Sequence, residues 1–136
     1  MTFYEYKTLS GQKGWKFNVV SDRHFKNIQY IHPLKQKIIA DIVEKAKNCP
    51  EIKRLIVFGS SITNKCDFQS DLDICIDWNI DCVDSDGVFV PETFDFMNFV
   101  SMITKGHADM VHYQYLEGTL IKDAVEEGVE VYVSHD

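Results

Sequence analysis

The chain has 136 residues, the usual size of one domain that can bury a core without a disulfide or a metal. Apolar residues make up 45% and charged residues 26%, which excludes a disordered or collagen-like chain. With 14 Lys and Arg against 21 Asp and Glu, the net charge of -7 argues against a broad basic surface for duplex DNA or an anionic membrane. It leaves open an acidic pocket that collects metal cations.

The first predicted unit is an aromatic-rich N-terminal extension, residues 1–33. Within it, residues 10–14 (SGQKG) stand between two short β-prone runs, a pattern that predicts a β-hairpin. We expect this extension to pack on the domain that follows, residues 34–136.

The rest of the chain alternates between helical and strand patterns. We predict helices over 34–48, from Pro91 to Gly106 and from Leu120 to Gly128. Strands are predicted over 52–58, 71–77, 108–113 and 129–133, and residues 78–90 read as a loop. The fold class is therefore α+β (mixed α/β), one mixed β-sheet with helices packed on it.

The cysteines and the hydropathy pattern bear on location. Four cysteines occur without a C-x-x-C pair, which is neither a zinc pattern nor a secreted disulfide framework: Cys49, Cys66, Cys75 and Cys82. No apolar run approaches the roughly 20 residues of a membrane span, and the N-terminus lacks a signal-peptide core. We expect reduced thiols, no membrane association and a cytoplasmic location.

The most informative stretch is Gly59-Ser60 at the end of a predicted strand, followed ten residues later by Asp71-Leu72-Asp73. Glycine allows a close approach of the backbone, and the amides and hydroxyl of a Gly-Ser turn, expected at the N-terminus of a helix, can bind an anion such as phosphate. Asp71 and Asp73, two residues apart on a strand, share one face and are separated by roughly 7 Å. Paired carboxylates of this kind suit Mg²⁺ or Mn²⁺ rather than zinc.

This pattern resembles the nucleotidyltransferase superfamily, which has the DNA polymerase beta fold, and especially its small single-domain bacterial (minimal, MNT-type) members. The family motif is Gly-Ser, about ten residues, Asp-x-Asp and a third carboxylate on a later strand. Here Gly59, Ser60, Asp71 and Asp73 match the first two parts, and Asp109 matches the third. The resemblance covers residues 34–133 and implies a nucleotidyltransferase fold.

The resemblance also implies the reaction and the roles of the residues. Asp71, Asp73 and Asp109 would be the catalytic carboxylates and would bind two Mg²⁺ or Mn²⁺ ions. An acceptor hydroxyl would attack the α-phosphorus of a nucleoside triphosphate, expected to be ATP, and pyrophosphate would leave. Nucleotide binding is expected at residues of the Gly-Ser turn and the loop after it: Gly59, Ser60, Ser61 and Lys65. Many relatives carry an arginine soon after Gly-Ser, which this segment lacks.

The acceptor is less specified than the reaction. Larger relatives carry an extra helical domain that builds the acceptor pocket, and small bacterial members often work beside a separate helical protein. The resemblance therefore implies a HEPN-type partner, with this chain as an antitoxin that nucleotidylates its toxin. Two alternatives stay open: a non-catalytic binding or antitoxin module of the same fold, and an aminoglycoside-type enzyme completed by a homodimer mate.

Other polar and aromatic residues receive plainer interpretations. Asp77 shares the face of the aspartate pair one step farther on and is predicted to be structural or to support the site. Asp81, Asp84 and Asp86 do not form an EF-hand, because Cys82 and Thr93 occupy positions that need acidic residues. The five histidines show no ligand spacing, although His107 precedes Asp109 by two residues. Trp78 and the cluster Phe94, Phe96 and Phe99 are expected to pack in the core.

Overall fold

A computed structural model describes residues 16–79 and 91–134 of the chain. Its centre is a four-stranded mixed sheet in the order β3-β2-β1-β4. The strands are β1 (Ile52–Phe58), β2 (Leu72–Trp78), β3 (Ala108–His112) and β4 (Val129–Val133). β1 runs antiparallel to both β2 and β4, whereas β2 and β3 are parallel. This is the mixed α+β architecture that the sequence predicts.

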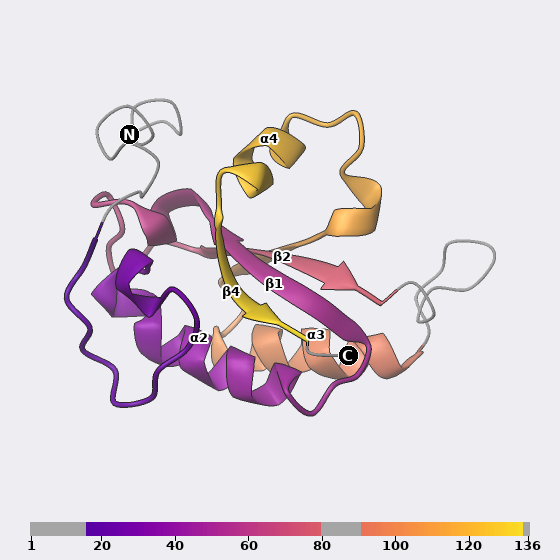
Figure 1. The fold of residues 1–136 in the computed structure, drawn as a ribbon, viewed down its shortest axis with the longest axis horizontal. Helices are drawn as coiled ribbons and strands as arrows, with labels where there is room; N and C mark the ends of the chain where they lie inside the picture. The colour runs from indigo at the N-terminus through magenta and orange to yellow at the C-terminus, as the bar shows by residue number, and fades with distance from the viewer. Residues whose placement is uncertain (1–15, 80–90, 135–136) are drawn as a thin grey trace.

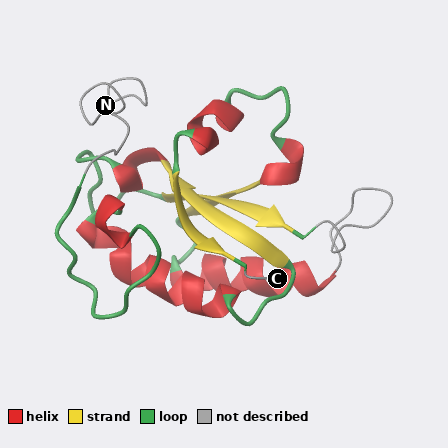
Figure 2. Cartoon of the chain, viewed as in Figure 1, coloured by secondary structure: helices red, strands yellow, loops and turns green. Residues whose placement is uncertain are grey.

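Two long helices cover one face of the sheet, and a short one stands on the other (Figures 1 and 2). α2 (Pro33–Ala46) and α3 (Pro91–Ile103) form the lower layer, and α4 (Ile121–Glu126) lies above the sheet. Both long helices begin with proline, whose fixed φ suits the first turn. After α3, Gly106 adopts φ 81° and its amide donates to the Ser101 carbonyl, which ends the helix as predicted.

The alternation of β2 divides its side chains between two apolar clusters. Leu72, Ile74 and Ile76 are buried against the layer of α2 and α3. Cys75 points to the opposite face. It packs against Leu116, which precedes α4, and against Val125, which belongs to α4. The aspartates at odd positions of this strand therefore belong to the face that α4 covers only in part.

The segment before α2 wraps onto the domain without forming a strand. The side chain of Gln36 is fully buried and accepts hydrogen bonds from the amides of Val20 and Ser21. It also donates to the carbonyls of Asn18 and Ile31. Residues 16–20 are therefore an irregular segment, because side-chain hydrogen bonds to a helix replace strand pairing. The rest of the expected hairpin lies outside the described residues.

Three other local expectations need correction. Leu120 is 91% exposed, because α4 begins only at Ile121 and buries a single residue, Val125. In the expected phenylalanine cluster only Phe96 is fully buried, whereas Phe94 is 48% exposed. Gly59 and Ser60 belong to a four-residue 3₁₀ turn, Gly59–Ile62, and not to the N-terminus of an α-helix. Trp78 is buried as predicted, packed edge-to-face on Phe96.

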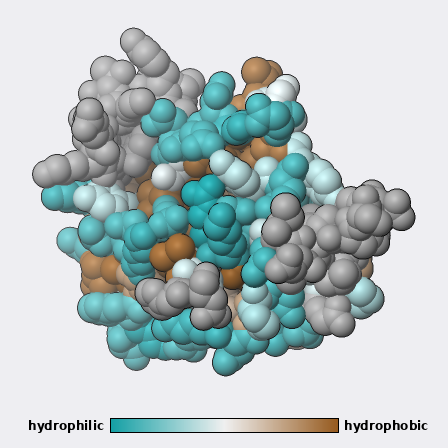
Figure 3. Space-filling model, turned by 45° about the vertical axis from the view of Figure 1, so that its right-hand side comes forward, coloured by the Kyte–Doolittle hydropathy of each residue, from teal (hydrophilic) through white to brown (hydrophobic). Residues whose placement is uncertain are grey.

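The surface of the described residues is mostly hydrophilic in the view of Figure 3, with hydrophobic side chains in separate patches. Within the described ranges, no helix combines the length and the apolar character that a membrane crossing requires.

Candidate active site

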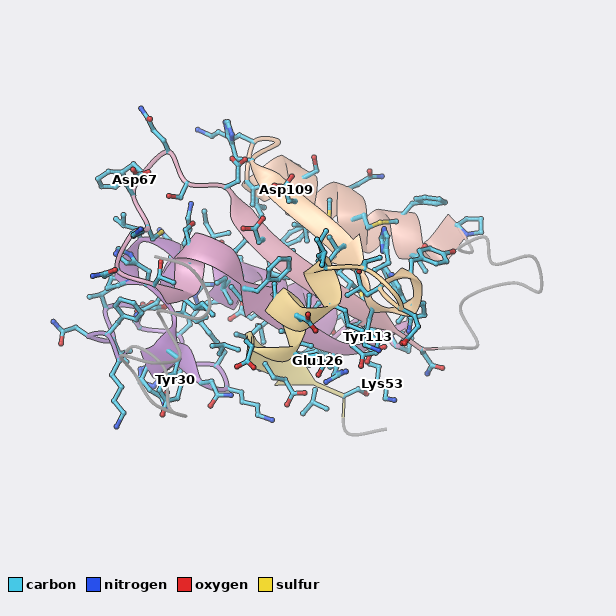
Figure 4. All side chains as sticks on the ribbon, turned by 90° about the horizontal axis from the view of Figure 1, so that it is seen from above. Tyr30, Lys53, Asp67, Asp109, Tyr113 and Glu126 are labelled. Atoms are coloured by element: carbon cyan, nitrogen blue, oxygen red, sulfur yellow. The ribbon has the colours of Figure 1, made fainter. Side chains whose placement is uncertain are left out.

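Parallel pairing of β2 with β3 brings together two of the predicted aspartates. Asp73 is the register partner of Asp109, and the third aspartate, Asp71, directly precedes β2. In an aligned pair of strands, register partners project to the same side of the sheet. Asp109 lies at the start of β3, at the end of the sheet where the β2 strand also begins (Figure 4). We call Asp71, Asp73 and Asp109 the carboxylate edge.

Gly59 shapes this edge from the neighbouring strand. Phe58, the last residue of β1, is the register partner of Asp73, so the turn that follows β1 reaches the Asp73 carboxylate. A Cβ atom on Gly59 would lie 2.1 Å from Asp73 Oδ2, and Gly59 has φ 74°. Only glycine combines this left-handed conformation with that approach. The Gly and the Asp of the motif are therefore in direct contact.

The electrostatics of the edge are those of crowded carboxylates. The pKa of Asp73 is raised to about 6, first by burial, then by repulsion from Asp109 and a hydrogen bond with it, and last by the charge of Asp71. Within the described residues, no Lys, Arg or His forms an ion pair with Asp73 or Asp109. The negative charge of Asp73 and Asp109 thus has no counter-ion in the part of the chain that the structure describes.

Asp71 occupies the rim of the edge and is more open to solvent. Its side chain is half exposed, and its Oδ1 atom lies 3.3 Å from Nδ1 of His107, which is also exposed. His107 precedes β3, so this contact joins the loops that lead into the two parallel strands. Asp71 therefore lies at the rim of the edge, in contact with the exposed His107 side chain.

The turn after β1 presents the residues expected to bind nucleotide in different environments. Ser60 is half-buried, and Lys65 is exposed on the following loop. The Ser61 hydroxyl is fully buried and finds no hydrogen-bond partner among the described residues. Thr63, which the sequence interpretation did not single out, donates from its hydroxyl and its amide to the Ser60 carbonyl. Its hydroxyl also accepts from the amide of Lys65, so Thr63 fixes the loop that follows the turn.

Asp77 belongs to a separate, structural network. It is buried, and its carboxylate accepts from Arg54 Nε at 2.6 Å and from the Gln114 amide at 2.8 Å. Arg54 in turn lies over the Tyr113 ring, whose hydroxyl donates to Glu126 (Figure 4). Asp77 thus joins β1 to β2 and to the segment after β3, in agreement with the structural role expected for it.

The carboxylate edge has the donor chemistry that a hard divalent cation requires. Three carboxylates supply oxygen ligands, and two of them lack a described counter-ion, so Mg²⁺ or Mn²⁺ fits this set better than a soft metal. Among the described residues, no three Asp, Glu, His or Cys side chains are already gathered tightly enough to cage a metal. A cation would therefore have to draw Asp71 toward the other two.

One residue that the sequence interpretation passed over lies directly beneath this edge. Lys35 is only 8% exposed, and its ammonium donates to the carbonyl of Ser70, one residue before Asp71, at 2.6 Å. A lysine on a polar-patterned helix position is usually solvated, so the periodicity of α2 gives no sign of it. The signal would have been the position of Lys35 in the first turn of a helix whose start faces the aspartate loop.

A family model described as "Polymerase beta, Nucleotidyltransferase" matches residues 40–136 of the chain. This match spans more than half of the sequence, so the chain belongs to the polymerase beta nucleotidyltransferase family. No curated protein matches the chain.

Three solved structures are similar at low sequence identity. A mutant of the toxin–antitoxin pair MntA–HpeT is 17% identical, with a TM-score of 0.49 and 74% of each chain covered. A toxin–antitoxin with AMP-PNP is also 17% identical, with a TM-score of 0.49 and 73% of each chain covered. The tri-AMPylated Shewanella oneidensis HEPN toxin in complex with MNT antitoxin is 18% identical, with a TM-score of 0.45; 74% of this chain and 71% of that chain are covered. At these values the family assignment rests on the sequence match alone.

Proposed function

We propose that the protein is a metal-dependent nucleotidyltransferase that transfers AMP from ATP to a hydroxyl group of a separate protein. The observation that supports this most is the carboxylate edge itself. Strand register sets Asp73 against Asp109, and Gly59 packs on Asp73 with no space for a side chain. A purely structural role would not require carboxylates to face each other without a described cation beside them.

The chain's own residues divide the work of the proposed reaction. Asp71 and Asp73 would hold the metal ions, and Asp109 would hold metal and accept the proton of the acceptor hydroxyl. The backbone amides of Gly59 and Ser60 bind the triphosphate, and Lys65 adds a cation on the exposed loop. Mg²⁺ or Mn²⁺, when bound, supplies charge neutralisation on the attacking and leaving oxygens. The hydroxyl oxygen bonds to the α-phosphorus. The bond from the α-phosphorus to the oxygen that bridges to the β-phosphorus breaks, and pyrophosphate leaves with its electron pair.

We infer a protein acceptor, of the HEPN type that the sequence resemblance implies, with this chain as the antitoxin of the pair. Asp109 and Asp71 are exposed, so a second protein can reach the carboxylate edge directly. The described elements are all used in the sheet and its two covering layers and build no further domain over the edge.

The test is label transfer in a co-purified pair. The chain is co-expressed with the protein encoded by the neighbouring reading frame, and the pair is incubated with α-labelled ATP and Mg²⁺. Label on the partner is expected, and its loss is expected in EDTA and in the Asp73→Asn variant, with Asp123→Asn as an exposed control outside the site. A stable pair that never acquires label would instead identify a non-catalytic binding module.

A further inference from the structure

A pocket of about 540 Å³ opens at the same end of the molecule as the carboxylate edge. It lies between the first turns of α2, the loop that leads into β2, and the turn that joins α3 to β3. His107 lines the pocket and contacts Asp71, so the pocket begins where the carboxylate edge ends. The Gly-Ser turn follows β1, whereas this pocket lies beside the starts of β2 and β3, at the same end of the sheet as Asp109.

The charge of the pocket is opposite to that of the chain. Lys35 and Lys105 line it, and among its described lining residues there is no Asp or Glu. In a chain with a net charge of -7, a cavity lined by lysines without carboxylates is unlike the average surface. Such a cavity attracts anions and repels polycations.

The Lys35 ammonium is the group that most clearly requires a partner. Lys35 as a residue is more than nine-tenths buried, the described hydrogen bond of its ammonium is the one to the Ser70 carbonyl, and no described carboxylate lies within ion-pair distance. A buried ammonium costs free energy unless it is paired. Its position in the first turn of α2 adds the positive end of the helix dipole. An anionic group entering the pocket would complete this pairing.

The remaining lining is apolar and suits side chains of a polypeptide. Ile38, Leu72 and Ile103 line the pocket, and Phe68 contributes a side chain that is 88% exposed. The described lining includes no arginine, whose planar fork is the usual device for a phosphate. A small polycation of the aminoglycoside kind would meet lysines and not carboxylates.

We propose that this pocket receives an acidic segment of the acceptor protein, with one of its carboxylates paired to Lys35 and its apolar side chains packed near Phe68. This inference rests on the proposed function, because it takes the carboxylate edge as the place of reaction. It adds the substrate class: an acceptor hydroxyl with acidic and apolar residues beside it in the polypeptide.

The test measures binding to the full chain by fluorescence anisotropy, in EDTA and without nucleotide. The probe is a short fluorescein-labelled peptide with glutamates on both sides of one tyrosine, and the matched probe has glutamines in their place. We expect the glutamate peptide to bind at least about tenfold more tightly, which corresponds to one charge-assisted hydrogen bond. Lys35→Met and Lys105→Gln should each lose most of this preference. Lys53→Met is the matched control, because Lys53 is exposed near the opposite end of the sheet (Figure 4).

Each other outcome would overturn the proposal. Equal binding of the two peptides, or an equal loss in Lys53→Met, would show that the pocket does not select an acidic segment. Displacement of the peptide by inorganic pyrophosphate at lower concentration than by unlabelled peptide would identify a phosphate subsite instead.

A thermal melt of Lys35→Met checks that the variant is folded. Because the assay contains EDTA and no nucleotide, its result is independent of label transfer, so a failure of this proposal and a failure of the proposed function are distinguishable.

Discussion

Gly59 belongs to the Gly-Ser motif and also adopts a left-handed backbone conformation that favours glycine. Its φ of 74° and the 2.1 Å from an added Cβ to Asp73 Oδ2 make any side chain there disturb the aspartate. Gly59→Ala should lower the free energy of unfolding by about 1–3 kcal/mol, through backbone strain and displacement of Asp73. Gly118→Ala is the matched control, because Gly118 has φ 79° and open space around it.

A urea titration of both variants checks this prediction, together with label transfer to the partner. Gly118→Ala should lose only about 1 kcal/mol, the cost of the left-handed backbone, and keep full transfer. Equal stability and equal transfer in the two variants would show that the Gly59–Asp73 contact is unimportant.

His112 gives the protein a pH-dependent contribution to stability outside the carboxylate edge. Trp78 Nε1 donates to His112 Nδ1 at 3.0 Å, which requires this nitrogen to be unprotonated, and burial lowers the pKa of His112 below 6.5. The folded state therefore binds fewer protons than the unfolded state. This contribution is present above the unfolded pKa and is lost as the pH falls below about 6.5.

The prediction for His112 is a difference in slope. Between about pH 7 and pH 5, the free energy of unfolding should fall more steeply for the wild type than for His112→Asn, whose amide oxygen keeps the acceptor but does not titrate. His24→Asn removes an exposed histidine and serves as the control. Chemical denaturation across the pH range measures all three, and parallel curves for wild type and His112→Asn would contradict the assignment.

At the scale of elements, the pairing of β2 with β3 sets two carboxylates against each other, and a bound cation would relieve their repulsion. Asp73 and Asp109 are register partners, and each raises the free energy of the other's charge. Without metal near neutral pH, Asp73→Asn should therefore raise the melting temperature by on the order of a few degrees. Mg²⁺ should raise the melting temperature of the wild type and have little effect on the variant.

Asp77→Asn is the matched control for this melt. It loses the charge that pairs with Arg54 at 2.6 Å, so its melting temperature should fall with and without Mg²⁺ while the Mg²⁺ effect persists. If Mg²⁺ leaves the melting temperature of the wild type unchanged, or raises that of Asp73→Asn by as much as that of the wild type, the carboxylate edge does not bind the metal.

The elements that the sequence predicted well are those in which apolar residues recur with a regular period. Leu72, Ile74 and Ile76 alternate, and the same alternation places Asp73 and Asp77 on the other face. Local patterns predicted less where a side chain replaces regular pairing. Gln36 ties residues 18–21 to α2, so the β-prone run there forms no strand. Leu120 fits a helical stripe, but the helix above the sheet is too short to bury it.

The candidate site shows the same division. The Gly-Ser and Asp-x-Asp spacing indicates Gly59, Asp71 and Asp73 as candidate site residues, and the family resemblance adds Asp109. The contact of Gly59 with Asp73 depends on the antiparallel register of β1 and β2, which a motif does not specify. Lys35 lies 36 residues before Asp71 along the chain and reaches the aspartate loop only through the packing of α2. Such distant contacts cannot be read from local sequence.

At the scale of the whole molecule, charge is arranged by region. Asp73 and Asp109 have no counter-ion among the described residues, and the adjoining pocket carries lysines without a described carboxylate. Two neighbouring regions of opposite sign suit a reaction that brings a cation and an anionic acceptor to one place. The net charge of -7 hides this separation.

If the carboxylate edge transfers a nucleotidyl group, the α-phosphorus of ATP must reach the partner. The position of a phosphorus label shows whether it does. The co-purified pair is given Mg²⁺ and ATP labelled at the α- or the γ-phosphorus. We expect the partner to acquire the α label alone and the γ label to leave in pyrophosphate. The Asp109→Asn variant should lower the transfer at least about a hundredfold. Transfer of the γ label, or undiminished α transfer in Asp109→Asn, would contradict this expectation.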